Sequence, residues 1–118
     1  MSELAGIAWF KFHEGDVDEF KRLSAQAMEI VRTKDTGTLQ YDVYFNDDQS
    51  ECVVLERFRD SDALLEHAQN LADVMEPIIA TGSVSGMLLG DPSPELKANF
   101  SDDGVVRLFS RYLSMQDD

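Results

Sequence analysis

Residues 38–58, "TLQYDVYFNDDQSECVVLERF", have an alternating pattern with a period of two, unlike the segments on either side. Apolar or aromatic residues take every second position in the first half: Leu39, Tyr41, Val43 and Phe45. This alternation is typical of a β-strand. The polar run "NDDQS" then predicts a turn, and "ECVVLERF" is a second segment rich in β-forming residues. We therefore expect two strands paired as an antiparallel hairpin.

A helical pattern precedes this hairpin in residues 16–37. Its apolar residues recur at helical spacing: Val17, Phe20, Leu23, Ala27, Ile30 and Val31. Asp16 can act as the N-cap, with Glu19 three residues later as in a capping box. Gly37 can take the left-handed conformation that ends or follows a helix. We expect one long amphipathic helix.

A second helical pattern follows the hairpin in residues 60–82. One face of this helix carries a set of mainly apolar residues: Ala63, Leu64, His67, Leu71 and Val74. Pro77 should break or kink the helix, because proline lacks the backbone N–H that a helix interior needs. Residues 77–80 are therefore expected to form a short turn.

Further strands are predicted outside these helices. Residues 4–12 form a strand in which Ile7 and Trp9 point to one side and Ala8, Phe10 and Phe12 to the other. Residues 82–90 form another strand, weakened by glycines. Ser93 as N-cap and Pro94 at the first helical position predict a short helix, and residues 104–114 a last strand.

This order of elements predicts the fold class. Strand, helix, strand, strand, helix, strand is typical of an α+β ferredoxin-like sandwich, with an antiparallel sheet and two main helices on one face. A C-terminal helix and strand are added to it. We expect a single domain over residues 1–118, with a core of about residues 4–90 and an extension over 91–118.

The first three predicted strands are largely apolar on both faces, although two helices can cover only one face of the sheet. An exposed apolar sheet face would exceed the few hundred Å² that soluble monomers usually tolerate. A second copy of the chain is the simplest cover, so we expect a homodimer.

Composition excludes several classes of function. The net charge of −13 argues against binding to nucleic acid or to an anionic membrane surface, since both need concentrated lysine and arginine. No run of about 18 apolar residues predicts a membrane span. The single cysteine, Cys52, with two histidines makes a zinc site unexpected, and we predict no metal. The N-terminus lacks the positive charge of a signal peptide, so a cytoplasmic location is expected.

The chain resembles the antibiotic-biosynthesis monooxygenase family, small dimeric α+β barrels that include quinol monooxygenases. Three segments carry the resemblance: "DTGTLQYDVY", "VVLERFRDSDALLEHAQN" and "GDPSPELKANF". In the second of these, strand residue Glu56 is followed eleven residues later by helix residue His67. The resemblance covers about residues 10–112.

This resemblance implies oxidation of a small quinol-like or polyphenolic aromatic by dioxygen, without flavin, haem or metal. Such a reaction needs a pocket that deprotonates a phenol and holds its anion, and histidine suits this work through its near-neutral pKa. Haem degradation is not expected, because the haem-degrading branch uses an asparagine on the first strand, a tryptophan and a histidine ligand, whereas the first strand here offers Trp9 and no asparagine. Alternatives on the same barrel are a non-catalytic binding protein and an isomerase or cyclase that needs no oxygen.

His67 is the candidate catalytic residue, as a base or anion stabiliser, because it shares the apolar helix face with Leu64. It could instead be a half-buried structural histidine. The candidate pocket residues are Trp9, Tyr41, Glu56 and Asn70. An unpaired carboxylate in an apolar strand is costly, so Glu56 should have a partner. The candidates for that partner are Arg57, Arg107, Arg111 and His67.

Overall fold

The hairpin, the helices and the outer strands form in the predicted order, in a computed structural model that describes residues 3–100 and 104–116. Their bounds are β1 Leu4–Phe12, α1 Val17–Lys34, β2 Thr38–Phe45, β3 Glu51–Phe58, α2 Ser61–Asn70, α3 Ala72–Ile79, β4 Gly82–Leu89, α4 Pro94–Lys97 and β5 Val106–Phe109. Within the described part of the chain, no helix is long and apolar enough to cross a membrane.

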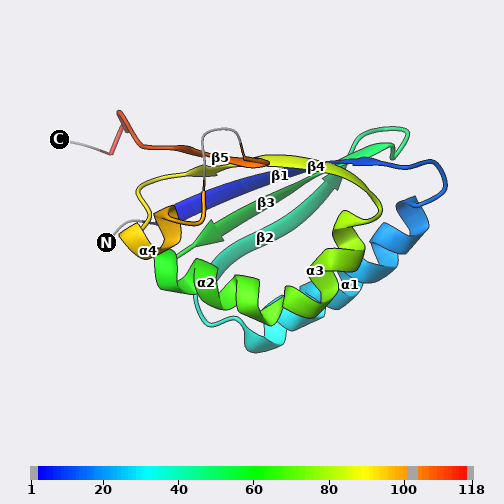
Figure 1. Cartoon of the computed structure of the whole chain (residues 1–118), viewed down its shortest axis with the longest axis horizontal. Coiled ribbons are helices and arrows are strands. Elements are labelled where there is room, and N and C mark those ends of the chain that lie inside the picture. The colour runs from blue at the N-terminus through cyan, green and yellow to red at the C-terminus, as the bar shows by residue number, and fades with distance from the viewer. Residues whose placement is uncertain (1–2, 101–103, 117–118) are drawn as a thin grey trace.

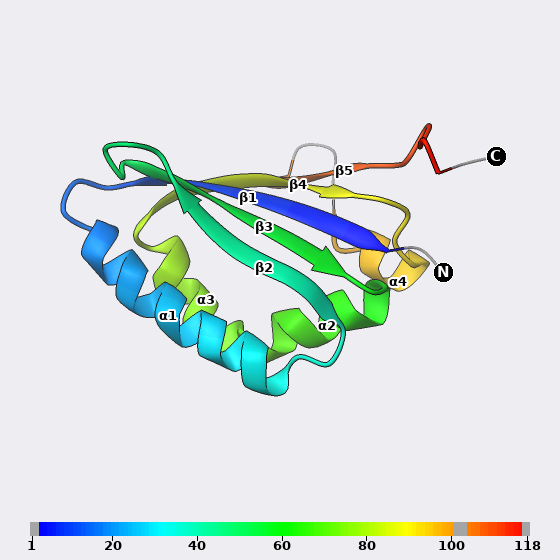
Figure 2. The ribbon, with the colours of Figure 1, turned by 180° about the vertical axis from the view of Figure 1, so that it is seen from behind.

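The strands form one five-stranded sheet in the order β2-β3-β1-β4-β5. Figure 1 shows α1, α2 and α3 along one face of this sheet, with no helix on the other. Figure 2 shows the same two layers from behind, with the short helix α4 beyond one end of α2. The predicted ferredoxin-like α+β fold, with its main helices on one face, is therefore confirmed.

The four core strands, β1 to β4, pair antiparallel as predicted, and the added C-terminal strand makes the sheet mixed. The strand β5 pairs parallel to β4 and spans four residues, where a longer strand over 104–114 was expected. The long connection that includes α4 brings the chain back to run beside β4 in the same direction, as a parallel pair requires. The last contact of this pair is the hydrogen bond from the Gly90 N–H to the Phe109 carbonyl, at 2.9 Å, just after the end of β4.

The helix α1 begins at Val17 as predicted, but not through a capping box. The Asp16 side chain makes no capping hydrogen bond. Glu19 instead accepts two hydrogen bonds from the Arg22 guanidinium, each of 2.7 Å. The start of α1 therefore follows from the apolar pattern of its buried face, while its charged residues pair along the exposed surface.

Gly37 does not take the left-handed conformation predicted for it; among the described residues only Gly15 and Gly90 are glycines with positive φ. The absence of a side chain at Gly37 instead allows close packing. A Cβ at position 37 would lie 2.5 Å from the Cβ of Ala63, so the chain after α1 can approach α2 only because residue 37 has no side chain.

The second helical segment breaks at Leu71 rather than at Pro77. Leu71 is 1% exposed and has φ −93° and ψ 0°, which separates α2 from α3. Pro77 lies inside α3, close to its end. It removes one intrahelical N–H there, and the short helix still continues to Ile79.

The core between helices and sheet has two parts. The larger cluster contains Phe10, Phe20, Leu23, Ala27, Val31, Cys52, Val54, Leu71, Val74 and Ile78. The smaller cluster contains Leu4, Phe58, Ala63, Leu88 and Leu96. The opposite face of the sheet carries large apolar side chains that no helix of the described residues covers, and Trp9, Tyr44 and Met87 are 46%, 53% and 38% exposed.

Candidate functional site

His67 points from α2 toward the sheet, and both of its ring nitrogens contact carboxylates. Nδ1 lies 2.7 Å from Oδ2 of Asp35, and Nε2 lies 3.0 Å from Oε1 of Glu56. The rings of Tyr41 and Phe58 pack against the imidazole at centroid distances of 5.4 and 5.0 Å. Two carboxylate acceptors favour an imidazolium that donates one hydrogen bond to each. In that state His67 has no lone pair for a metal or haem iron.

Asp35 orients this histidine through Nδ1, the ring nitrogen that does not contact Glu56. It follows α1 directly, with extended backbone, and its side chain is only 1% exposed. Its carboxylate also accepts hydrogen bonds from the Thr38 hydroxyl at 2.7 Å and from the Asn70 amide at 2.8 Å. Three elements of the fold therefore meet at Asp35: the end of α1, the start of β2 and the last turns of α2.

Glu56 lies at the centre of the sheet face that the helices cover. In the register of β3, its neighbours are Tyr41 on β2 and Gly6 on β1. Its side chain is 18% exposed, compared with 7% for His67 and 1% for Asp35. Glu56 is therefore the member of the triad Asp35–His67–Glu56 that is most open to a ligand.

Burial and pairing act in opposite directions on the titrating groups of the triad. Burial alone would lower the pKa of His67, but its hydrogen bonds and charge interactions with Glu56 and Asp35 raise that pKa above its ordinary value. Burial alone would raise the pKa of Asp35, and hydrogen bonds from Asn70, Thr38 and His67 lower it instead. Both directions stabilise an imidazolium beside an ionised Asp35.

A cavity of about 420 Å³ lies beside the triad, between α1, α3 and the sheet. Glu56, His67 and Tyr41 line it among mainly apolar side chains. Burial and the nearby charges of Glu56 and Asp35 raise the pKa of Tyr41, so its phenol stays neutral near pH 7. The size and lining of this cavity are typical of a site for a small, largely apolar molecule.

Four of the five predicted site residues come together here: His67, Glu56 and Tyr41 around the cavity, and Asn70 behind Asp35. Trp9 does not join them. It lies on the opposite face of the sheet, where its indole N–H donates to Glu51 at 2.7 Å. Because strand side chains alternate, Trp9 cannot share the face of its neighbours Ala8 and Phe10.

Asp35 and Thr38 were not singled out from the sequence. A buried histidine commonly requires an acceptor, but Asp35 is 32 residues from His67 and reads as a polar residue at a helix end. Burial raises the pKa of the Cys52 thiol to about 12, which disfavours the thiolate that a nucleophilic cysteine needs. Among residues 3–100 and 104–116, no group of three or more His, Cys, Asp or Glu side chains is arranged to hold a metal.

Comparisons with known proteins agree with this architecture. The family model described as antibiotic biosynthesis monooxygenase matches residues 5–72, more than half of the chain. A comparison with curated protein sequences gave no match.

Three solved structures illustrate the likeness. MupZ from Pseudomonas fluorescens has a TM-score of 0.77 and 20% identity, with 98% of this chain and 94% of that chain covered. Rv0793 from Mycobacterium tuberculosis has a TM-score of 0.67 and 24% identity, with 77% of this chain and 96% of that chain covered. SnoaB from Streptomyces nogalater, a cofactor-independent oxygenase, has a TM-score of 0.67 and 16% identity, with 79% of this chain and 96% of that chain covered. At these identities the structures show the fold, whereas the family match shows that the chain belongs to the antibiotic biosynthesis monooxygenase family.

Proposed function

We propose that this protein is a cofactor-independent oxygenase that oxidises a small quinol-like or polyphenolic aromatic with dioxygen. The observation that carries the proposal is the triad Asp35–His67–Glu56, whose most exposed carboxylate lies at an apolar cavity of about 420 Å³. Support comes from membership of the family and from the likeness to SnoaB, a cofactor-independent oxygenase.

The first chemical step is the transfer of a phenol proton to Glu56. The carboxylate becomes neutral and the substrate becomes a phenolate, so one negative charge moves from Glu56 to the ligand. The imidazolium of His67 stabilises this new anion through the hydrogen bond that it shares with Glu56. Asp35 holds the imidazole ring in position and keeps it charged. The sequence-based role of His67 as a base thus shifts toward Glu56, with His67 as the anion stabiliser.

The second step uses the electron-rich anion itself. One electron passes from the phenolate to dioxygen, and the resulting aryloxyl radical and superoxide combine at a ring carbon that carries hydrogen. Protonation gives a hydroperoxide, and loss of water leaves a carbonyl group. One oxygen atom ends in the product and the other in water, so no external reductant is needed. The apolar lining of the cavity excludes water from the reactive intermediates.

Oxygen uptake across a panel of hydroquinones and anthrones tests this proposal. Glu56→Gln keeps an oxygen that can accept from His67 but cannot take a proton, so we expect a rate loss of about 10²–10⁴-fold. Glu51→Gln is the matched control on the same strand, since Glu51 lies on the other face and bonds Trp9. A Glu56→Gln enzyme with the wild-type rate would contradict the role of Glu56. A wild-type protein that consumes no oxygen and converts no substrate would favour a binding protein.

An isomerase or cyclase that needs no oxygen is the second candidate. The Glu56 carboxylate can remove a proton from one atom of a substrate and return it to another, which requires no oxidant. Running the same panel under anaerobic conditions separates the two candidates. Product formed without oxygen would favour the isomerase.

We also propose that the protein acts as a homodimer in which a second copy covers the outer face of the sheet. Trp9, Tyr44 and Met87 are exposed together on that face, where the described residues place no helix. Apolar surface of this kind is typical of a protein interface. Sedimentation equilibrium would give twice the chain mass of 13.3 kDa if the proposal holds, and the chain mass if it does not.

A further inference from the structure

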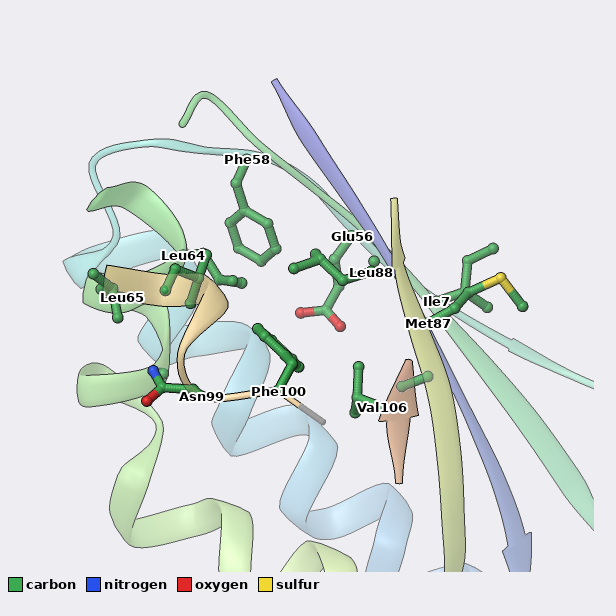
Figure 3. Close-up of a pocket in the computed structure, with 14 residues that line it drawn as sticks. Ile7, Glu56, Phe58, Leu64, Leu65, Met87, Leu88, Asn99, Phe100 and Val106 are labelled. Atoms are coloured by element: carbon green, nitrogen blue, oxygen red, sulfur yellow. The ribbon is translucent and has the colours of Figure 1, made fainter. Parts of the chain in front are cut away.

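Glu56 lines a second cavity as well as the one beside His67. This second cavity has a volume of about 330 Å³ and lies between the sheet, α2, α4 and Phe100. Figure 3 shows the Glu56 carboxylate pointing into it, with Phe58, Leu64, Leu88 and Phe100 around it. Among the described residues that line it, Asn99 is the only one besides Glu56 with a polar side chain.

The two cavities adjoin each other on the helix-covered face of the sheet. They share three lining residues, Ala8, Glu56 and Val106. The cavity beside His67 is lined by members of the larger core cluster, and the second cavity by members of the smaller cluster. The reactive carboxylate therefore stands between two apolar spaces that lie over different parts of the sheet.

Small residues on β1 create this space. The side of β1 that faces the helices reads Leu4, Gly6, Ala8, Phe10, so two small residues interrupt a run of large ones. Gly6 is the direct neighbour of Glu56 in the register. A Cβ at Gly6 would meet only Glu56, at 3.8 Å, and the backbone of Gly6 does not have positive φ. A larger side chain would thus fit the strand, and it would fill the second cavity.

We propose that the substrate is an elongated molecule with one polar reacting group near its middle and an apolar arm on each side. The reacting group contacts Glu56, one arm enters the cavity beside His67, and the other enters the cavity beside Phe100. Gly6 and Val84 determine this specificity, because Gly6 lines only the second cavity and Val84 only the first. This inference rests on the proposed function, since it places the phenol of that reaction at Glu56.

Binding of alkylated hydroquinones, measured by calorimetry without oxygen, tests the inference. The probes are 2-propylhydroquinone, with one arm, and 2,5-dipropylhydroquinone, with two arms on opposite sides of the ring. Burial of each methylene tightens binding by about fourfold, so a second propyl arm can add up to about 60-fold. We expect the wild-type protein to bind the two-armed probe at least about tenfold more tightly.

Two variants assign the arms to their cavities. Gly6→Val fills the second cavity and Val84→Phe fills the first, and each should remove the gain from the second arm. Ser83→Val is the control, because Ser83 is exposed at the start of β4 and lines neither cavity. The inference is overturned if neither probe binds, if the two probes bind equally to the wild type, or if the gain survives both cavity-filling variants. A two-armed preference without oxygen uptake would refute the oxygenase while the inference about the arms stands.

Discussion

Replacing Asp35 with asparagine probes the buried triad directly, because it removes one negative charge and almost no volume. Asp35 accepts three hydrogen bonds, from Thr38, Asn70 and His67, at 2.7, 2.8 and 2.7 Å. An asparagine oxygen can still accept from Thr38 and His67, and its amide can donate to Asn70 if that side chain turns its oxygen inward. The variant therefore isolates the interaction between the Asp35 charge and the imidazolium.

The expected cost follows from burial. Removing one partner of a buried ion pair costs about 3–5 kcal/mol when the other charge is left unpaired. The imidazolium keeps Glu56 at 3.0 Å and the asparagine keeps its hydrogen bonds, so we expect a smaller loss of about 2–3 kcal/mol at pH 5. Above the raised pKa of His67 the ring is neutral, and the loss should shrink to about 1 kcal/mol.

Urea unfolding of wild type and Asp35→Asn at several pH values measures this difference. NMR titration of the His67 ring should also show a lower pKa in the variant, since an anion that favours the imidazolium is gone. Asp47→Asn is the control, because Asp47 is exposed in the hairpin loop, and its effect should stay within about 0.5 kcal/mol. The reasoning is refuted if Asp35→Asn unfolds at the wild-type urea concentration, or if its deficit is independent of pH.

Two further predictions concern stability. The pKa of His67 is raised in the folded state, so its contribution to folding stability should be complete below the ordinary value of 6.5 and should be lost as pH rises through the folded-state pKa. The pKa of Asp35 is lowered, so its contribution to folding stability should be complete above 3.8 and should be lost as pH falls through the folded-state pKa. Urea midpoints that rise steadily from pH 6 to pH 10 would contradict the first part. Gly37→Ala should cost about 1–3 kcal/mol, because the new Cβ would lie 2.5 Å from that of Ala63. A double-mutant cycle with Ala63→Gly measures the coupling, and additive effects would show that the two positions do not clash.

Local patterns predicted the elements well, and they failed where distant contacts intervene. The alternation in residues 38–58 and the helical spacing on either side are properties of neighbouring residues, so the hairpin and helices appear in the predicted order. The breaks were harder to predict. The second helical segment is interrupted at Leu71, a buried core residue that gives no helix-breaking signal in the sequence, and Gly37 is constrained by Ala63, which is 26 positions further along the chain.

The partner of Glu56 shows how the fold selects among alternatives. Arg57 is the next residue, so it points to the opposite face of the sheet, where it pairs with Glu3 at 2.8 Å. Arg107 lies over the ring of Phe109 on β5. Arg111 is exposed beyond the end of β5, and of the four candidates it is His67 that the described residues bring to Glu56, at 3.0 Å.

The amino-acid sequence alone specified the order of strands and helices, the two faces of β1, and an inward-facing histidine. These features depend on the spacing of residues along the chain, which is read without knowledge of the fold. Tertiary structure was needed to show which face of β1 the helices cover, and so to separate Trp9 from the cavity. It was also needed to bring Asp35 to His67, because a contact between residues 32 positions apart depends on how α1 and α2 pack.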